Sequence, residues 1–303
     1  MDFAQKRRTE GRTASAAVED IIALLKPIAA QQGVDLQGRL EEAAAQKEVG
    51  RRHLAERLQR AVMPLFKYHR GYPGTIGSCV LVRLDSTCYV FTAAHVLRDA
   101  GDAPLWFPPR GEGEKFLRLP QSAGLALLAD RSGLDVGVLI LPANTLSAFE
   151  HRVFLTGSEI DPGDQQDEAG LTSFYYVLGY SGSRTQAKVS AKTRQINQRS
   201  FQVSTFIASA PEYARENLSQ SDHILLDYDH KEIAIKRKRV TPPRLQGVSG
   251  GGIFHLSGIT QQGPLVAIAT ENRRLSRLIV GTRIQHFLDA ARDLRGRLQA
   301  ADV

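Results

Sequence analysis

The feature that most constrains the fold is a series of short, β-rich runs that begins after Gly71. The runs are rich in β-branched and aromatic residues, and Gly, Ser, Asp and Pro, which favour turns, separate them. The expected strands are Cys79–Arg83, Cys88–Thr92, Val136–Leu141, Phe174–Leu178, Phe201–Ile207, His223–Tyr228, Glu232–Ile235, Gly252–His255 and Leu265–Ala269. Many short strands joined by turns predict a mostly β protein, built as a barrel or a sandwich.

The chain before residue 70 has a different composition, in which the good helix formers Ala, Leu, Glu, Gln and Arg dominate. A first helix is predicted by apolar residues that share one helical face, namely Ile21, Leu24, Leu25 and Ile28. A second helix, capped by Asp35, is expected to bury Leu36, Leu40, Ala44, Leu54, Leu58, Val62 and Leu65. We therefore expect an N-terminal helical extension over residues 1–69 and a second domain over residues 70–303.

Two roles of the extension are compatible with this pattern. The first is a helical hairpin that packs on the main domain. The second is a docking or regulatory element that binds a partner, or a second copy of the chain, through residues 14–66. At the other end of the chain, Arg283–Ala300 returns to a helical period, so a C-terminal helix is expected there.

The composition excludes several classes of protein. Hydrophobic residues make up 42% of the chain and charged residues 23%, which excludes wholesale disorder. The two cysteines, Cys79 and Cys88, are too few for a secreted disulfide scaffold, and we expect both to be reduced core residues. The sequence has neither an apolar signal core nor a membrane span, so a cytoplasmic protein with no membrane partner is expected. The net charge of +7 favours acidic partners only weakly.

The strongest local motif is a serine within a run of glycines, Gly247-Val248-Ser249-Gly250-Gly251-Gly252. Glycines allow the backbone to turn tightly around the serine, which leaves its hydroxyl exposed. They also allow amide N–H groups to point into open space where an oxyanion can bind. By itself, the run is equally compatible with a glycine-rich turn that has no chemical role.

A serine hydroxyl is a weak nucleophile, so it needs a general base, and the base needs a group that orients it. His95 ends one β-rich run and Asp135 begins another, both among small and apolar neighbours. Such neighbours suit a base and a carboxylate that are shielded from water. Taken singly, His95 also fits a buried core histidine, and Asp135 also fits a cap at the start of a strand.

Taken together and in this chain order, His95, Asp135 and Ser249 resemble the three catalytic residues of the chymotrypsin-like (trypsin-like) serine peptidases. Thr-Ala-Ala-His, Asp-Val-Gly-Val-Leu and Gly-Val-Ser-Gly-Gly are similar to the three motifs of that family. The resemblance covers about residues 70–295. It implies a chymotrypsin-like double antiparallel β-barrel with the site in the cleft between the barrels.

The family's organisation also implies where each part of the chain belongs. The first barrel is expected at about residues 70–160, the second at about residues 171–282, and the C-terminal helix at about residues 283–300. The polar segment Asp161–Gly170 lies where this arrangement needs a connector.

The family's roles, carried over by resemblance, imply that Ser249 attacks the scissile carbonyl, His95 accepts and returns the proton, and Asp135 orients the imidazole. The backbone N–H groups of Gly247 and Ser249 would form the oxyanion hole. The implied activity is hydrolysis of a protein or peptide substrate through an acyl-enzyme, with no metal or organic cofactor. Val96 stands where secreted animal relatives commonly carry a cysteine, which implies a bacterial or intracellular branch. We expect a regulated serine endopeptidase that acts on a dedicated protein target.

The expected specificity pocket departs from the family. Pro243 stands where trypsin carries the acid that selects Arg or Lys, so selection of a basic residue by that route is not supported. The residues expected to line the pocket are Pro243, Arg244, Ala269, Thr270 and Glu271. An inward-pointing Arg244 would favour an acidic residue before the scissile bond, whereas a solvated Arg244 would have no such role.

Three alternatives to this prediction share part of the pattern. The Gly-x-Ser-x-Gly pattern also fits the nucleophile elbow of α/β-hydrolases, but there the acid and the histidine follow the serine. Only His255 and His286 follow Ser249, and no strand–helix alternation surrounds it. The second is a catalytically silent binding module with this fold. The third is nucleic-acid binding through Lys236–Arg239, which is disfavoured because stacking aromatics and a recognisable module are lacking.

Overall fold

The computed structural model describes residues 52–69, 72–108, 116–119, 125–129, 134–162, 173–181, 200–228, 233–235, 238–240, 245, 247–257 and 263–301. The chain divides into two compact units, Met1–His53 and Leu54–Val303, and all the labelled strands and helices belong to the second. The helix expected around Ile21, and the start of the helix expected after Asp35, lie outside the described residues. The end of the second helix is described: residues 52–61 are helical, and Leu58 is buried as expected. Both roles of the N-terminal extension therefore stay predictions.

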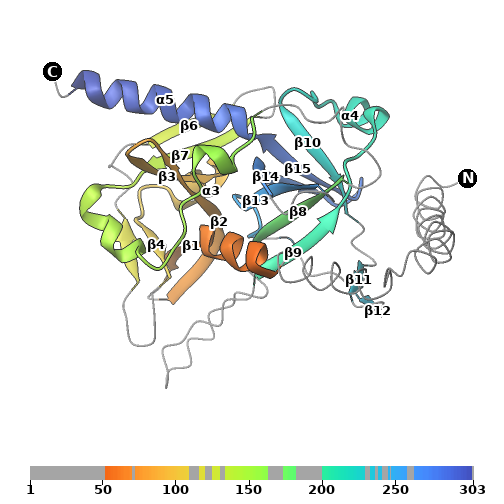
Figure 1. Cartoon of the computed structure of the whole chain (residues 1–303), viewed down its shortest axis with the longest axis horizontal. Coiled ribbons are helices and arrows are strands. Elements are labelled where there is room, and N and C mark those ends of the chain that lie inside the picture. Colours follow the sequence, from red (N-terminus) through yellow and green to blue (C-terminus); the bar gives the residue numbers. More distant parts are fainter. Residues whose placement is uncertain are drawn as a thin grey trace, which may run out of the picture. The chain divides into compact units, whose positions relative to one another are not determined.

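The first sheet has seven antiparallel strands in the order β5-β4-β1-β2-β3-β7-β6 (Figure 1). The strands are β1 (Val62–His69), β2 (Tyr72–Leu84), β3 (Thr87–Thr92), β4 (Leu105–Phe107), β5 (Leu117–Leu119), β6 (Leu125–Ala129) and β7 (Asp135–Ile140). Buried apolar side chains from these strands and the following helices form one cluster, which includes Met63, Leu81, Val90, Leu97 and Phe107. The first three strands form consecutive hairpins, and strands from later in the chain extend both ends of the sheet.

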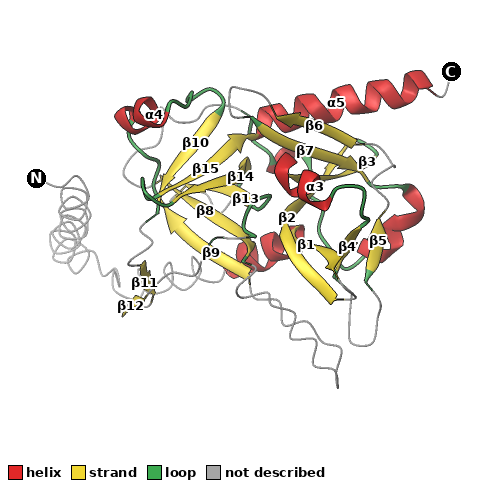
Figure 2. Cartoon of the chain, turned by 180° about the vertical axis from the view of Figure 1, so that it is seen from behind, coloured by secondary structure: helices red, strands yellow, loops and turns green. Residues whose placement is uncertain are grey.

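The second sheet has six antiparallel strands in the order β10-β15-β14-β13-β8-β9, and it lies beside the first sheet (Figure 2). The strands are β8 (Ser173–Tyr180), β9 (Ser200–Thr205), β10 (His223–Asp227), β13 (Gly252–Ser257), β14 (Leu265–Arg273) and β15 (Leu278–Arg283). A separate two-stranded hairpin consists of β11 (Ile233–Ile235) and β12 (Lys238–Val240).

Short helices connect the strands, and one longer helix ends the described chain. They are α3 (Ala94–Ala100), α4 (Ala210–Glu216) and α5 (Ile284–Ala301), with 3-10 helices η2 (Ala143–Phe149) and η3 (Gly157–Glu159). A capping box fixes the start of α4, because Ser209 and Glu212 satisfy each other's backbone N–H groups. Asn217 ends that helix in the left-handed conformation, which asparagine tolerates well.

One apolar cluster contains residues of both sheets and of α5. Phe91 of β3 packs on Phe287 of α5, with the ring centroids 5.6 Å apart. Leu178 of β8 and Phe254 of β13 belong to the same cluster and are fully buried. The two sheets and the C-terminal helix therefore share a core.

The segment from Val62 to His69, which the sequence predicted as helix, is strand β1. It pairs with β2 along its whole length, with one register shift after Leu65. Val62 and Leu65 continue the helical spacing of Leu54 and Leu58, which explains the helix prediction, but the residues from Val62 to Phe66 are all buried, as on a strand that is covered on both faces. Pro64 also disfavours a helix interior, because proline has no backbone N–H to donate and its ring clashes with the preceding turn. The helix prediction was wrong here, and the first sheet begins before residue 70.

Every strand expected from the sequence overlaps an observed strand. The unexpected strands are β1, β4, β5, β6, β12 and β15. The helix expected over Arg283–Ala300 is confirmed as α5.

Cys79 and Cys88 are both free and buried, as the sequence predicted. Cys79 lies opposite Met63 of β1, whereas Cys88 lies opposite Arg83 of β2, so the two cysteines do not face each other. Burial raises the pKa of the Cys79 thiol, which disfavours the reactive thiolate. Within the described part of the chain, no helix is both long and apolar enough to cross a membrane.

A buried histidine makes the stability of the fold depend on pH. The ring of His255 on β13 stacks on Tyr175 at a centroid distance of 5.2 Å, and its Nε2 has no hydrogen-bond partner among the described residues. Burial lowers the pKa of His255, and the nearby Asp161 only partly opposes this. The unfolded chain therefore binds a proton more readily, and stability falls as pH drops through the ordinary histidine pKa of about 6.5.

We expect His255→Phe to lose less stability than wild type when the pH falls from about 7.5 to about 5.5, because phenylalanine stacks but does not titrate. Urea unfolding at the two pH values measures the difference. His53→Gln, at an exposed histidine, serves as the control and should keep the wild-type pH dependence. An equal loss in wild type and His255→Phe would contradict the prediction.

Candidate active site

His95 lies in the first turn of α3, directly after β3. The alanines on either side of this junction, Ala93 and Ala94, are fully buried. The helix packs closely on β7 at Gly137, where a Cβ atom would lie 2.8 Å from Leu97 Cδ1 and 3.2 Å from Ala93 O. Small residues thus allow α3 to pack directly on β7. The His95 side chain is about one-third exposed to solvent.

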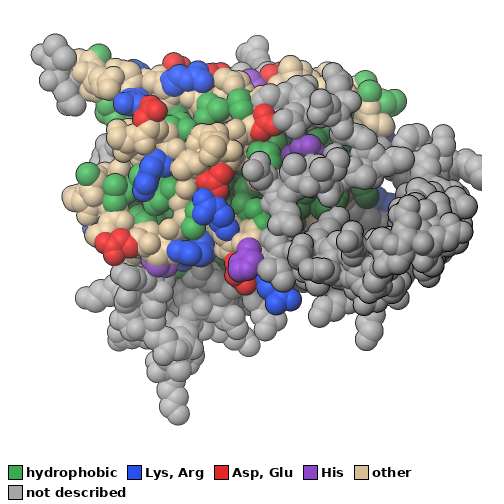
Figure 3. Space-filling view, in the orientation of Figure 1, with side chains coloured by type: hydrophobic (Ala, Val, Ile, Leu, Met, Phe, Trp, Pro, Cys, Tyr) green, Lys and Arg blue, Asp and Glu red, His purple; other side chains and the backbone are tan. Residues whose placement is uncertain are grey.

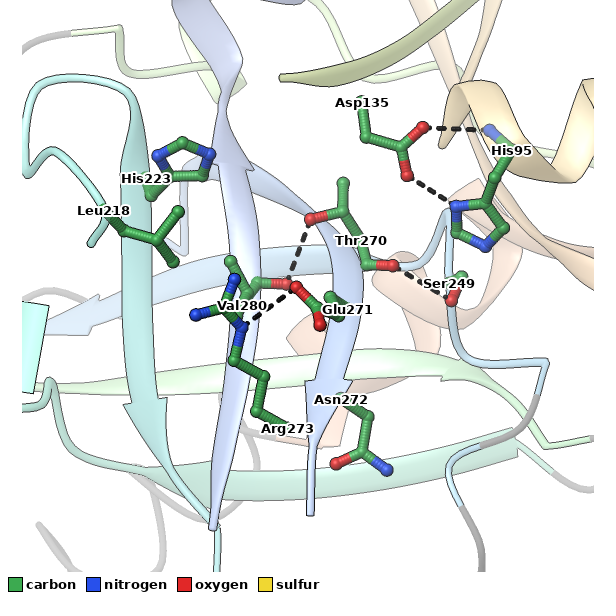
Figure 4. Close-up of a pocket in the computed structure, with 10 residues that line it drawn as sticks. All are labelled: His95, Asp135, Leu218, His223, Ser249, Thr270, Glu271, Asn272, Arg273 and Val280. Atoms are coloured by element: carbon green, nitrogen blue, oxygen red, sulfur yellow. Dashed lines mark hydrogen bonds and ion pairs between the residues drawn. The ribbon is translucent and has the colours of Figure 1, made fainter. Parts of the chain in front are cut away.

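Asp135, the first residue of β7, holds His95 at two points (Figure 4). Its Oδ1 accepts the backbone N–H of His95 at 2.9 Å, and its Oδ2 lies 2.5 Å from His95 Nδ1. A carboxylate only accepts, so in the neutral imidazole the proton resides on Nδ1 and Nε2 is an acceptor. The guanidinium of Arg98 lies 3.7 Å from Asp135 Oδ1 and adds a weaker, solvent-screened attraction.

Ser249 lies in a turn that main-chain hydrogen bonds define. The N–H of Val248 donates to Leu245 O at 2.9 Å, and the N–H of Gly251 donates to Val248 O at 2.8 Å. The second bond fixes the peptide between Val248 and Ser249, so the N–H of Ser249 points away from the turn. No hydrogen bond within the described residues uses the N–H of Gly247 or of Ser249.

The residue after the serine must be glycine. Gly250 has a φ of 88°, and a Cβ atom there would lie 1.9 Å from the carbonyl oxygen of Ser78 on β2. Its N–H donates to Ala269 O of β14 at 2.7 Å. A loop of the second sheet thus approaches the backbone of the first sheet at this position, where no larger residue fits.

The hydroxyl of Ser249 donates to Thr270 O at 3.2 Å. No hydrogen bond joins Ser249 and His95 in the part of the chain that the structure describes. Figure 4 shows the serine beneath the imidazole ring with its Oγ directed at Thr270. Transfer of the hydroxyl proton to His95 therefore requires Ser249 to leave the Thr270 carbonyl.

A pocket of about 370 Å³ contains all three candidate residues. It is lined by His95, Asp135, Leu218, His223, Ser249, Thr270, Glu271, Asn272, Arg273 and Val280. These residues come from α3, from the loop before β13, from strands of both sheets and from the segment after α4 (Figure 4). Among the described residues, no group of metal-binding side chains is present in this pocket or elsewhere.

One wall of the pocket is a strand with an open edge. β13 pairs with β14 only as far as the Gly252–Ile268 pair. From Ala269 to Arg273, β14 pairs with β15 on its other edge, with a register shift before Glu271. Within the described chain, no strand occupies the edge of β14 that continues past Ser249, so its backbone groups are available to an extended ligand.

Ion pairs hold the far end of this wall. Arg273 donates to Glu271 Oε2 at 3.0 Å and to Glu216 Oε2 at 2.9 Å. Hydrogen bonds from Ser276 and Arg273 lower the pKa of Glu216. The Glu271 side chain remains about half exposed, so it presents a carboxylate at the rim of the pocket.

Only some of the residues expected to form the specificity pocket line the observed pocket. Thr270 and Glu271 line the observed pocket, whereas Ala269 is buried beside it and anchors the serine loop. Pro243 and Arg244 lie outside the described residues.

Sequence reasoning missed several residues of the pocket wall. Asn272 and Arg273 belong to the continuation of β14 beyond Ala269, where the sequence changes to a polar run without the alternation that would indicate a strand. The remaining residues that were missed are Leu218, His223 and Val280. Their segments lie near Ser249 only in the tertiary fold, and no local sequence pattern predicts this position.

The arrangement of the strands is similar to that of a solved protein. A crystal structure of a scabies mite inactivated protease paralogue is 13% identical, with a TM-score of 0.51, and the match covers 80% of this chain and 96% of that one. The fold is a chymotrypsin-like double β-barrel. This confirms the fold class expected from the sequence.

Other solved structures match with lower TM-scores. The tobacco vein mottling virus protease is 11% identical with a TM-score of 0.43, covering 77% of this chain and 83% of that one. A serine endoprotease from Yersinia pestis is 15% identical with a TM-score of 0.47, covering 80% and 66%. No family model and no curated protein matches the chain.

Within the double barrel, the candidate residues come from both halves. His95 and Asp135 belong to the first barrel, whereas Ser249 belongs to the loop before β13 in the second. The scabies mite relative is described as inactivated, so the likeness concerns the fold and carries no conclusion about activity.

Proposed function

We propose that the protein is a serine endopeptidase that hydrolyses peptide bonds through an acyl-enzyme at Ser249. One observation carries the proposal above all others. The imidazole of His95, bonded to Asp135 at Nδ1, shares one pocket with a serine in a glycine turn. Such a grouping supplies a nucleophile, a base and a group that orients the base.

In the proposed acylation step, Ser249 Oγ attacks the carbonyl carbon of the scissile bond while His95 Nε2 takes the hydroxyl proton. Asp135 keeps Nδ1 protonated and stabilises the imidazolium that forms. The negative charge that develops on the carbonyl oxygen would be stabilised by the N–H groups of Gly247 and Ser249. His95 then returns its proton to the amine nitrogen, and the carbon–nitrogen bond breaks.

In the proposed deacylation step, water takes the place of the released amine. His95 removes a proton from this water as its oxygen attacks the ester carbonyl of the acyl-enzyme. The bond between carbon and Ser249 Oγ breaks, the serine regains its proton from His95, and the product leaves as a carboxylic acid.

The open edge of β14 supports a peptide as the substrate. An extended chain can add to an open strand through main-chain hydrogen bonds. Bound beside Thr270, such a chain would compete with Ser249 for the Thr270 carbonyl and so release the hydroxyl toward His95.

Labelling with a fluorophosphonate probe, read by intact-mass spectrometry, tests the proposal. We expect one adduct in wild type and none in Ser249→Ala or His95→Ala, because the probe reacts only with an activated serine. Melting temperatures within a few degrees of wild type establish that both variants are folded. An adduct that persists in Ser249→Ala, or no adduct in wild type with peptide present, would contradict the proposal.

The second candidate function is a catalytically silent binding module. The hydrogen bond from Ser249 to the Thr270 carbonyl favours it, because the hydroxyl is engaged away from His95. Peptide binding without any labelling of Ser249 would be its signature.

Nucleic-acid binding has less support. On the face in Figure 3, the Lys and Arg side chains of the described residues are scattered among Asp and Glu. The side chains of the basic run at residues 236–239 lie outside the described part of the chain.

A further inference from the structure

Ser78, on β2 of the first barrel, is a fully buried polar residue with no assigned role. A buried serine normally needs one or two partners to offset the loss of water. Ser78 instead takes part in four hydrogen bonds, two through its backbone and two through its hydroxyl. Three of them reach the second barrel, so this residue joins the two halves of the fold.

Two of these bonds hold the loop around Ser249. The Ser78 hydroxyl donates to Gly247 O at 2.8 Å, and the Ser78 N–H donates to Ser249 O at 2.7 Å. Both carbonyls belong to residues whose N–H groups are the candidate oxyanion donors. Ser78 therefore contacts both ends of the two-peptide stretch that carries these donors.

The peptide between Gly247 and Val248 is fixed at both ends. Its carbonyl accepts from the Ser78 hydroxyl, and its N–H donates to Leu245 O at 2.9 Å. A planar peptide held at both ends cannot rotate, which limits the orientation of the flanking Gly247 N–H. Gly247 has a φ of 93°, and glycine has little intrinsic preference that would hold such a conformation without these bonds.

The direction of the hydroxyl proton follows from the second contact of Ser78 Oγ. The backbone N–H of Tyr180 on β8 donates to this oxygen at 2.8 Å. Since Tyr180 supplies the proton of that bond, the proton of the serine hydroxyl is directed to Gly247 O. Alanine at this position would leave both main-chain groups without this partner.

Ser78 is itself held from the side of His95. The hydroxyl of Thr92 donates to Ser78 O at 2.7 Å, and Thr92 lies at the end of β3, just before the helix that carries His95. Ser78 thus connects the strand that positions the candidate base with the loop that positions the candidate nucleophile.

We infer that Ser78 is a positioning residue, which holds the Gly247–Ser249 loop so that its N–H groups face the developing oxyanion. The inference rests on the proposed function, because it assigns the loop a role in acyl transfer. The order that Ser78 gives to this loop does not depend on activity.

The test compares Ser78→Ala with wild type by the kinetics of fluorophosphonate labelling. Alanine removes the hydroxyl and keeps both backbone bonds. Loss of one oxyanion donor lowers turnover by about 100- to 1,000-fold, so we expect a misoriented loop to lower the maximal labelling rate by roughly 10-fold or more. The half-saturating probe concentration should stay within about twofold, because the pocket wall is unchanged.

Thr205→Val is the matched control. It also removes a buried hydroxyl that donates to a main-chain carbonyl, that of Asp227, in a part of the second barrel away from the pocket. We expect it to lower the melting temperature and to leave the labelling rate unchanged. Labelling of folded Ser78→Ala at the wild-type rate would overturn the inference, as would equal slowing in Thr205→Val.

Hydrogen exchange separates this inference from the proposed function. Amides in peptides that cover residues 245–252 should exchange roughly 10-fold faster in Ser78→Ala and at the wild-type rate in Thr205→Val. If wild type is never labelled but exchange is still faster in Ser78→Ala than in wild type, the serine endopeptidase proposal fails and the positioning role of Ser78 is supported. An exchange rate in Ser78→Ala equal to that of wild type would overturn the positioning role.

Discussion

Asp135→Asn is expected to slow fluorophosphonate labelling of Ser249 by a factor on the order of 10³–10⁴. The amide oxygen can still accept the backbone N–H of His95, so the local fold is retained. The amide nitrogen, however, is a donor and faces Nδ1, which forces the imidazole proton onto Nε2. The nitrogen that should accept the serine proton is then blocked.

Arg98→Met is the control for this experiment. It removes the positive charge 3.7 Å from the Asp135 carboxylate and leaves both hydrogen bonds to His95. Since an exposed ion pair contributes about 1 kcal/mol or less, we expect the labelling rate to change by no more than about fivefold. Equal losses in Asp135→Asn and Arg98→Met would show that charge, and not the tautomer, is what Asp135 supplies.

Gly250→Ala is expected to be among the most destabilising substitutions in the second barrel. Its Cβ would lie 1.9 Å from Ser78 O and 2.2 Å from Thr92 Oγ1, and its φ of 88° already disfavours any side chain. Because the collision involves a backbone atom, the loop must move away from β2. We expect a loss of about 5 kcal/mol or failure to fold, measured by urea unfolding.

Gly101→Ala separates the collision from the backbone strain. Gly101 also has a positive φ, of 59°, but a Cβ atom there would meet nothing within 4 Å. We expect only the strain, about 1–3 kcal/mol. If Gly250→Ala is no more destabilising than Gly101→Ala, the loop and β2 are not in the close contact described.

The sequence predicted the fold class and the three candidate residues because each has a strong local context. Each candidate residue lies in a short segment that indicates its chemistry without knowledge of the fold: Thr92 to His95, Asp135 to Leu139 and Gly247 to Gly251. Gly250 illustrates the reason, since its φ and its contact with β2 allow no other residue. A contact required by the tertiary fold thus restricts the residue types at neighbouring positions, and the restriction is visible as a local motif.

The parts that the sequence did not predict depend on distant contacts. The sequence predicts a helix where β1 forms, because Val62 and Leu65 continue the helical spacing of Leu54 and Leu58, and burial on both faces removes the alternation typical of a strand. His223 lies in the pocket only because β10 pairs with β15, which brings it near Val280. Ser78 has an unremarkable local sequence, and its partners Gly247 and Ser249 are far away along the chain.

The shared apolar core also has a consequence for the order of events during synthesis. Phe287 and Leu294 of α5 pack in one cluster with Phe91 and Val138 of the first barrel and Phe254 of the second. A ribosome that has just added Ser249 has not yet made β13, β14 and β15, nor the helix that closes this core. The pocket therefore forms only after β14 and β15 have been made, and a nascent chain that ends at Ser249 carries His95 and Asp135 without the strands that line the pocket beside them.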